Sequence, residues 1–459
     1  MRIPLELAVH VTNARLLDAH RAPDSLRVVT DTRALLPGET FLALHGEHFD
    51  GNDYTAQAVA GGASALIVDR EGAHVPGVAT LVVPDTLWAY MALAAAARER
   101  FGGRVVAITG STGKTTTKAL LAQLLEHRYP GRILAAPANE NNEIGVAKLL
   151  LAMESTHDVA IVEMGARKYG DIAVLVAMAQ PHIGVLTNIG EAHLEIMGTR
   201  ERLEETKWGI FSRGARAILN LADEASHRRS LSLSKPAHWF YAGEHAIAPP
   251  AGARACEIVG RSELLVTDAV SKTTAHAIDV RLPGAHNRAN LAAALAAALD
   301  LEVTAEMLVG AIAALELPEG RFQRIALAGG PQLIYDAYNA SATGTLASLE
   351  AFADEPAPRR IAVLGGMAEL GDDAQAMHER VGEAAAKVVD WLLAGGEFAQ
   401  ALARGAVHGD LPRERIVTYA TNHEAVQWLR THARREDLVL LKASRKYHLE
   451  EIVEELRSP

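Results

Sequence analysis

Residues 105–117, Val-Val-Ala-Ile-Thr-Gly-Ser-Thr-Gly-Lys-Thr-Thr-Thr, constrain the fold of this chain more than any other stretch. An apolar, β-branched run predicts a buried strand, small residues interrupt it, and leucines then recur at helical spacing over residues 120–125. Glycines between a strand and a helix let several backbone N–H groups point at one spot, which suits a phosphate. Lys114 can reach terminal phosphates, and the Thr115 hydroxyl can ligate Mg²⁺.

The stretch therefore predicts a nucleotide phosphate loop in a parallel α/β domain. The residues expected to hold the phosphates are Gly110, Ser111, Thr112, Gly113, Lys114, Thr115 and Thr116. The loop is a shortened variant, because Ile108 stands where the usual pattern has a glycine. A plain glycine-rich turn is the alternative, but it does not explain Lys-Thr-Thr at the start of the helix.

Composition limits the class of protein. A length of 459 residues suggests about three domains, and 49% hydrophobic with 22% charged residues fits chains with apolar cores. A net charge of −11 argues against nucleic-acid binding, and a lone cysteine, Cys256, excludes a disulfide framework. No run of about 18 apolar residues and no leader pattern is present. We expect a cytoplasmic monomer without stable membrane insertion.

Changes of pattern divide the chain into three expected domains. Residues 1–100 form a small α/β domain, and residues 101–316 alternate strand and helix in the manner of a mostly parallel sheet. Within the second domain, residues 238–282 predict a β-rich insert. Leu-Pro-Glu-Gly at 317–320 predicts a hinge, after which the α/β alternation restarts and runs over 317–459. The expected strands lie at 40–44, 64–68, 159–162, 183–187, 217–219, 262–267, 277–282, 333–334, 361–364, 391–393, 416–417 and 438–441.

Four isolated side chains invite a functional or a structural interpretation. Glu163 closes a predicted strand beside a glycine, where a Mg²⁺-binding carboxylate belongs, although a solvated strand end is the alternative. His193 follows the end of another strand. Lys207 lies on a charged helix face, where pairing with Glu204 is the default. Arg33 suits a phosphorylated ligand and a surface position equally well.

Five motifs in this order resemble the Mur ligases, the ATP-dependent ligases that build the peptide of bacterial cell-wall precursors. The motifs are Asp-Thr-Arg at 31–33 with Pro-Gly-Glu-Thr-Phe at 37–41, Asn-Glu-Asn-Asn-Glu-Ile-Gly at 139–145, Tyr-Asn-Ala at 338–340, Val-Leu-Gly-Gly-Met-Ala-Glu-Leu-Gly at 363–371 and Leu-Lys-Ala-Ser-Arg at 441–445. Within that family they are most similar to the branch that adds D-alanyl-D-alanine.

The resemblance implies a fold, substrates and cofactors. It implies α/β architecture with a small uridine-nucleotide domain, a central P-loop domain for ATP and a Rossmann-like third domain that receives the amino substrate. The substrates would be UDP-N-acetylmuramoyl-tripeptide and D-alanyl-D-alanine, joined through an acyl phosphate with ATP and Mg²⁺.

The same resemblance assigns roles to single residues. Lys114, Glu163, His193 and Lys207 would be catalytic, and Thr115, Glu163, His193 and Lys207 as a carbamate would serve the metal sites. Nucleotide contacts beyond the phosphate loop would come from Asn287, Asn290, Arg321 and Asp336. Substrate contacts would come from Thr32, Arg33, Asn141, Asn142, Tyr338 and Asn339.

Some positions of the third domain differ from that branch. Tyr335 replaces an aspartate, Ser341-Ala342 replaces Asn-Pro, and Gly366 replaces an aspartate. A related ligase with another amine or acceptor is therefore an alternative. A nucleotide-dependent switch is a further alternative, but the Asn-Lys-x-Asp guanine signature that it predicts is absent from the sequence.

Overall fold

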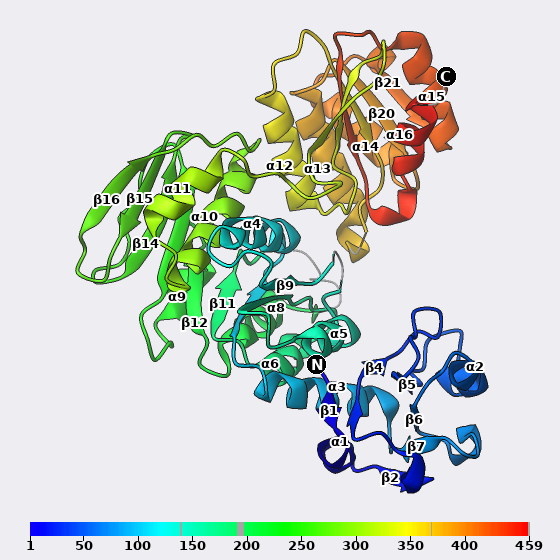
Figure 1. The fold of residues 1–459 in the computed structure, drawn as a ribbon. Coiled ribbons are helices and arrows are strands. Elements are labelled where there is room, and N and C mark those ends of the chain that lie inside the picture. Colours follow the sequence, from blue (N-terminus) through cyan, green and yellow to red (C-terminus); the bar gives the residue numbers. More distant parts are fainter. Residues whose placement is uncertain (138–139, 191–196, 369, 458–459) are drawn as a thin grey trace.

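The protein is described here by a computed structural model covering residues 1–137, 140–190, 197–368 and 370–457. Three lobes follow one another along the chain, from the blue lobe through the cyan and green centre to the yellow-to-red lobe (Figure 1). Each lobe combines helices with a mostly parallel sheet, so the predicted α/β class is confirmed.

The first lobe has a mixed sheet in the order β2-β7-β6-β5-β4, parallel except at β2, with β1 and β3 paired separately. Its elements are β1 (Ile3–Pro4), α1 (Leu5–Thr12), β2 (Arg15–Leu17), β3 (Ser25–Leu26), β4 (Val28–Val29), β5 (Thr40–Leu42), α2 (Thr55–Ala60), β6 (Ala65–Val68), β7 (Ala79–Val82) and α3 (Thr86–Glu99).

The central sheet has the order β16-β15-β14-β13-β12-β11-β8-β10-β9, and among its described pairs only β14–β15 and β15–β16 are antiparallel. Its strands are β8 (Arg104–Thr109), β9 (Ile133–Ala135), β10 (Val159–Glu163), β11 (Ile183–Leu186), β12 (Arg216–Asn220), β13 (His238–Gly243), β14 (Arg254–Val259), β15 (Glu263–Thr267) and β16 (Thr273–Ala277). The β-rich segment thus continues the central sheet. The strand predicted at 277–282 is wrong, because β16 ends at Ala277.

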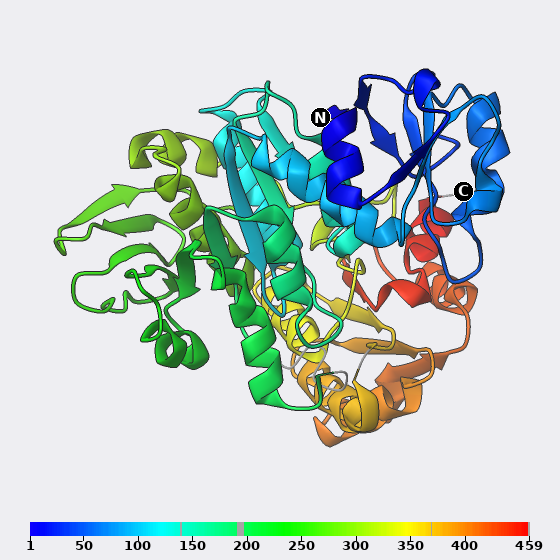
Figure 2. The same ribbon diagram turned by 90° about the horizontal axis from the view of Figure 1, so that it is seen from below.

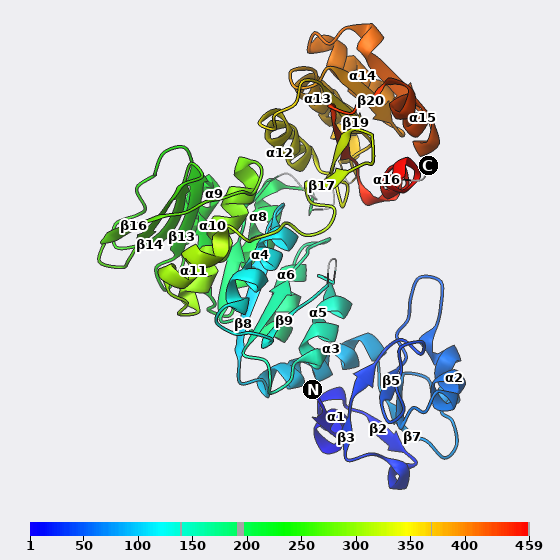
Figure 3. The same ribbon diagram turned by 45° about the horizontal axis from the view of Figure 1, so that its top comes forward.

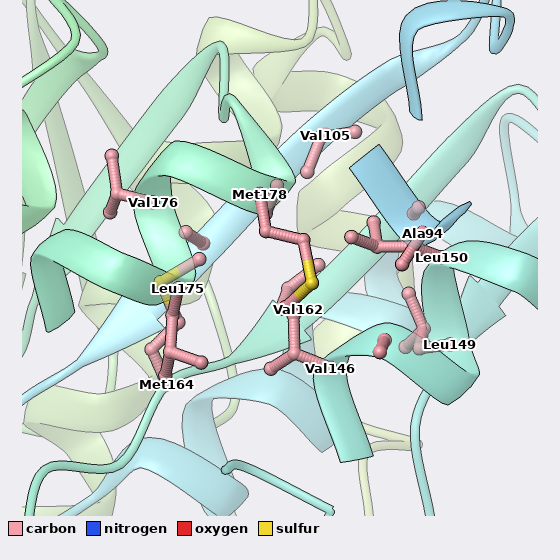
Figure 4. Packing of buried hydrophobic residues seen from close by; sticks show 14 of the residues in the cluster. Ala94, Val105, Val146, Leu149, Leu150, Val162, Met164, Leu175, Val176 and Met178 are labelled. Carbon is pink, nitrogen blue, oxygen red and sulfur yellow. The ribbon is translucent and has the colours of Figure 1, made fainter. Parts of the chain in front are cut away.

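Helices cover both faces of this sheet. They are α4 (Lys114–Glu126), α5 (Glu143–Ala152), α6 (Asp171–Ala179), α8 (Arg200–Trp208), α9 (Glu224–Ser230), α10 (Ala285–Asp300) and α11 (Ala305–Ile312). On one face α4 packs against the alanine-rich α10. On the other face α5 and α6 pack together with α3, so Ala94 of α3 shares a core with Leu150 and Met178 (Figure 4).

The third lobe has the sheet order β17-β18-β22-β19-β20-β21, parallel except at β17. Its elements are β17 (Gln323–Ala326), β18 (Gln332–Tyr335), α12 (Ala342–Ala353), β19 (Arg360–Leu364), α13 (Ala374–Ala386), β20 (Trp391–Gly395), α14 (Ala399–His408), β21 (Ile416–Tyr419), α15 (Asn422–His432), β22 (Leu438–Lys442) and α16 (Glu450–Arg457). Helix α12 approaches the start of α10 so closely that a Cβ at Gly284 would lie 2.6 Å from the Cβ of Ala351 (Figure 3).

The first lobe is anchored to the centre by polar contacts as well as by the shared core. The amino group of Met1 bonds to the Leu151 carbonyl at the end of α5, and Figure 2 shows the N-terminus beside the central lobe. Arg98 of α3 is buried; its Nε donates to the Ala179 carbonyl at 2.8 Å and its Nη2 to the Gln180 carbonyl at 2.9 Å. Arg98 therefore caps the C-terminus of α6 from another lobe.

We expect Arg98→Met to lower the free energy of unfolding by about 2–4 kcal/mol, because two helix-end carbonyls lose a charged donor. Urea unfolding, followed by circular dichroism, measures the change. Arg100→Met, at an exposed position two residues on, is the matched control. Equal stability of both variants would show that the cap contributes nothing.

Candidate active site

The phosphate loop lies between β8 and α4 at the carboxyl edge of the central sheet. β8 pairs with β10 on one side and with β11 on the other, so the loop sits where successive connections diverge, the usual ligand position in such sheets. Gly110 and Gly113 have φ values of +148° and +82°, which other residues rarely adopt. Side chains at these two positions would also collide with Thr187 and Asn290 respectively. Both glycines are therefore required by the shape of the loop.

Residues after β11 hold the loop in place. The Ser111 N–H donates to the Asn188 carbonyl at 3.0 Å, and the Thr112 N–H donates to the Asn188 side-chain oxygen at 3.1 Å. The Lys114 ammonium folds back to the Gly110 carbonyl at 2.9 Å. The predicted strand–loop–helix geometry for binding phosphate is thus present.

Glu163 ends β10 beside the loop and is 2% exposed, so the interpretation as a solvated strand end is wrong. Its Oε1 accepts hydrogen bonds from the Thr115 hydroxyl at 3.2 Å and from Asn141 Nδ2 at 3.0 Å. Its Oε2 lies 3.2 Å from the Lys118 ammonium but outside hydrogen-bonding geometry. Burial opposes ionisation of Glu163, yet Lys118, Lys114 and Asn141 outweigh it and hold its pKa below the ordinary value.

Mg²⁺ is the metal that these donors fit. The Oε2 atom of Glu163 is buried without a hydrogen-bond partner among the described residues, and the Thr115 hydroxyl lies beside the other oxygen. The described residues contain no cluster of three or more His, Cys, Asp or Glu that could hold a metal. A magnesium site built from one carboxylate, one hydroxyl and substrate phosphates needs no such cluster. His193 lies outside the described residues.

A cavity of about 490 Å³ joins the loop to the third lobe. The predicted site residues that line it are Ser111, Thr112, Gly113, Lys114, Thr115, Thr116, Asn141, Glu163, Asn287, Asn290, Arg321, Asp336, Tyr338 and Asn339. The structure therefore brings together the predicted phosphate, nucleotide and amine-side residues, which are spread over more than 200 positions of sequence.

Arg321 and Tyr338 of the third lobe and His286 of the central lobe line the far wall of the cavity. The Arg321 guanidinium lies 4.4 Å from the ring centre of Tyr338, a cation–π contact. Burial, together with the nearby Glu163 carboxylate, raises the pKa of the Tyr338 phenol, which places this third-lobe side chain close to the nucleotide side. Burial lowers the pKa of His286, at the start of α10, to about 4.

Asp336 lines the cavity, but much of its bonding capacity is used within the third lobe. It accepts bonds from the Phe322 N–H at 3.2 Å, from the Ser348 hydroxyl and from the Lys442 ammonium at 2.8 Å. Burial opposes its ionisation, and Lys442 with Ser348 outweighs burial, so its pKa lies below the ordinary value. The Asp336–Lys442 pair joins the ends of β18 and β22, and Asp336 also holds the backbone at Phe322.

Lys207 is buried, with 1% of its surface exposed, so the prediction of an exposed lysine paired with Glu204 is wrong. Glu204 instead accepts bonds from Arg228 at 2.6 Å and Arg229 at 3.4 Å on α9. Burial, followed by the nearby Lys114 charge, lowers the pKa of Lys207 to about 7. A large fraction of the amine is then neutral near neutral pH, which is the form that reacts with CO₂.

Other predicted residues lie away from the cavity. The Arg33 side chain is 85% exposed and bonds to Asp31, with Nη2 donating at 2.7 Å. Thr32 likewise does not line the cavity, and Asn142 caps α5 by accepting from the Gly145 N–H at 2.9 Å. Gly110 does not line the cavity either, and its positive φ shapes the phosphate loop.

Two buried lysines at the site are not predicted by the sequence motifs. Lys118 follows Lys114 by four residues, a spacing that places both on one face of α4 and could have revealed it. Lys442 ends an apolar strand inside a motif that was recognised, but its pairing with Asp336 joins residues 106 positions apart and has no local signal.

The differences from the D-alanyl-D-alanine branch have local explanations. Ser341 is the N-cap of α12 and accepts from the Gly344 N–H, a role that Asn fills equally well, and Ala342 takes the first helical position, where Pro is common. Tyr335 packs in a core and donates to Glu450 at 3.3 Å. A side chain at Gly366 would collide with the phenol of Tyr447.

Comparison with known proteins decides the family. Models of the Mur ligase family match residues 27–99 (catalytic domain), 108–298 (middle domain) and 320–445 (glutamate ligase domain). A Synechocystis protein named UDP-N-acetylmuramoyl-tripeptide–D-alanyl-D-alanine ligase is 37% identical, covering 94% of this chain and 91% of its own. The chain belongs to the Mur ligase family. The Escherichia coli protein of the same name is 33% identical to this Mur ligase, covering 99% of this chain and 98% of its own.

Solved structures agree with this membership. The crystal structure of MurF from Acinetobacter baumannii matches this Mur ligase with a TM-score of 0.86 at 29% identity, over 100% of this chain and 99% of its own. MurF from Thermotoga maritima in complex with ADP matches with a TM-score of 0.78 at 28% identity, over 94% and 97%. The predicted fold and family are thus confirmed across the whole chain. Among the residues described, no helix has the length and apolar character needed to cross a membrane.

The pKa of Lys207 predicts a pH dependence of stability. Between pH 7 and about 10, the unfolded chain keeps a proton on this lysine that the folded protein has lost, so stability rises with pH. Relative to Lys207→Met, the free energy of unfolding of the wild type should rise by up to about 1.4 kcal/mol per pH unit. Urea unfolding at pH 7, 8 and 9 in CO₂-free buffer measures the difference. A difference independent of pH would mean that the folded lysine stays charged.

Proposed function

We propose that this Mur ligase joins D-alanyl-D-alanine to UDP-N-acetylmuramoyl-tripeptide, converting ATP to ADP and phosphate. One observation carries the proposal. A single cavity contains the phosphate loop, the buried Glu163, Asn141 of the segment after β9 and Tyr338-Asn339 of the third lobe. If these residues bind the nucleotide, the carboxylate substrate and the amine, the three sites adjoin each other, as an ATP-dependent ligase requires.

The chemistry explains why these sites must adjoin. A carboxylate does not condense with an amine in water, so ATP first transfers its γ-phosphoryl group to the carboxylate of the tripeptide and leaves as ADP. The amine of D-alanyl-D-alanine then attacks the carbonyl carbon of this acyl phosphate. The tetrahedral intermediate expels phosphate, and the amide forms with loss of the amine proton. The phosphoryl step needs alignment and charge neutralisation more than covalent help.

Residues of the central domain supply the alignment and neutralisation. The backbone N–H groups at the start of α4 would contact the ATP phosphates, and so would the Lys114 ammonium once it left the Gly110 carbonyl. Asn287 and Asn290 hold the nucleoside side of the cavity, with Asn290 also accepting from Thr117 at 3.4 Å. Thr115, Glu163, His193 and carbamylated Lys207 would hold Mg²⁺, which supplies further neutralisation of phosphate charge when bound.

The first and third domains would bind the two other substrates. Residues 1–100, with Thr32 and Arg33 on their surface, would bind the uridine nucleotide, so the long acceptor reaches from there toward Asn141 and Asn142. Residues 317–459 would bring the amine beside Tyr338 and Asn339 and exclude water from the acyl phosphate. We place this reaction in the cytoplasm, where ATP and nucleotide-linked substrates are available.

Mass spectrometry of purified protein with ATP, UDP-N-acetylmuramoyl peptides and a panel of dipeptides tests the proposal. The expected product contains D-alanyl-D-alanine, and ADP forms only when acceptor and amine are both present. Preference for another amine would favour the alternative, a related ligase with a different amine. The positions that differ from the D-alanyl-D-alanine branch support that alternative only weakly, because each has a local structural explanation. ADP formation without acceptor or amine would contradict ligation.

Lys114→Ala should lower turnover by about 100-fold or more while the protein stays folded, because the lysine is the first residue of α4 and acts through its charge. Coupled ADP release measures turnover, and thermal unfolding checks the fold. Lys387→Ala, an exposed lysine of the third lobe, is the control. Near-normal turnover in Lys114→Ala would contradict the nucleotide assignment.

Lys207→Ala should lose most ligase activity and recover part of it when a small carboxylate such as acetate is added. The carboxylate would enter the space left by the buried side chain and replace the carbamate oxygens. Lys207→Met fills that space with a chain of similar length, so acetate should not restore its activity. Rescue of both variants, or full activity in Lys207→Ala, would contradict the carbamate.

A further inference from the structure

Lys118 is a buried cation to which neither the proposed chemistry nor the phosphate loop assigns a role. It lies one turn after Lys114 on α4 and is 4% exposed. Its ammonium is 3.2 Å from Glu163 Oε2 and donates to the Pro137 carbonyl at 3.3 Å. Because a buried ammonium costs several kcal/mol to desolvate, its two partners hold it in a defined position.

The segment after β9 is attached to Glu163 at two points. We call residues 136–137 and 140–142 the acceptor segment. At one end, Pro137 bonds to Lys118, which in turn contacts Glu163. At the other end, Asn141 donates to Glu163 Oε1 at 3.0 Å and its carbonyl accepts from the Gly165 N–H at 2.8 Å. The position of the acceptor segment therefore depends on the position of the Glu163 carboxylate.

Glu163 is at the same time part of the nucleotide side. Its Oε1 is bonded to Thr115 of the phosphate loop, and its Oε2 has no hydrogen-bond partner among the described residues. A cation that approached Oε2 would repel the Lys118 ammonium. A hydrogen-bond donor that approached Oε2 would compete with this ammonium for the oxygen. Lys118 donates its described hydrogen bond to Pro137, so displacement of its ammonium would change the acceptor segment.

We propose that Lys118 is a positioning residue that couples the acceptor segment to the nucleotide site, so that binding at each site changes the affinity of the other. The proposal rests on the proposed function, which assigns the acceptor to this segment. The coupling acts through direct contacts of one ammonium group and needs no movement of a domain. It is reciprocal, as any binding linkage must be.

Calorimetric titration with UDP-N-acetylmuramoyl-tripeptide, with and without Mg²⁺ and a non-hydrolysable ATP analogue, tests the proposal. The ratio of the two dissociation constants is the coupling factor. In the wild type we expect a factor of about 5 or more, the lower range for coupled sites. In Lys118→Met, which keeps the length but removes the charge and the donor, the factor should fall to near 1. Lys387→Met, an exposed lysine in another lobe, should keep the wild-type factor.

Lys118→Gln is the second variant, and it guards against a general loss of structure. A role limited to stability would lower the unfolding temperature and weaken both ligands without changing their ratio. A wild-type factor near 1, an unchanged factor in Lys118→Met, or failure of both variants to fold would overturn the coupling role. Absence of acceptor binding by the wild type, with nucleotide binding intact, would contradict the proposed function itself.

Discussion

The Glu163 carboxylate is the group on which the rest of the site depends. A buried charge is tolerated only when opposite charge and hydrogen bonds surround it. Here α4 supplies Lys118 and Thr115, and the segment after β9 supplies Asn141. Satisfying one carboxylate thus brings the start of the phosphate-loop helix and the acceptor segment to the same point at the end of β10. The adjacency of the phosphate loop and Asn141 follows from this single electrostatic requirement.

Residues of the central lobe and of the third lobe share the lining of the site. Residues of the central sheet hold the phosphate side, while the third lobe contributes Tyr338 and Asn339 across the cavity. The buried Asp336–Lys442 pair holds the start of the third lobe through the Phe322 N–H. This division suits a reaction in which an acyl phosphate must be protected from water until an amine arrives.

Substitutions in a binding motif do not all report on the ligand. Ser341 and Ala342 occupy the N-cap and first turn of α12, where several residues serve equally well, and Tyr335 belongs to a core. Gly366 differs from the other positions, because the phenol of Tyr447 occupies the space that a side chain at residue 366 would need. The residues at the differing positions therefore reflect mainly how helix ends are capped and how side chains pack, and they say less about the identity of the amine.

The sequence by itself determined the α/β class, most strands and the phosphate loop, because each depends on local periodicity and on glycines at a strand–helix turn. It could not determine the burial of Glu163 or Lys207, which depends on packing by distant segments. The sequence predicted a Mg²⁺-binding carboxylate at Glu163 with a solvated strand end as the alternative, and it suggested a surface ion pair for Lys207. The tertiary structure alone decided these points and the pairing of Lys118 with Glu163 and of Lys442 with Asp336. Buried charges pair with residues that are close in the folded structure, and their separation along the sequence does not indicate which residues these are.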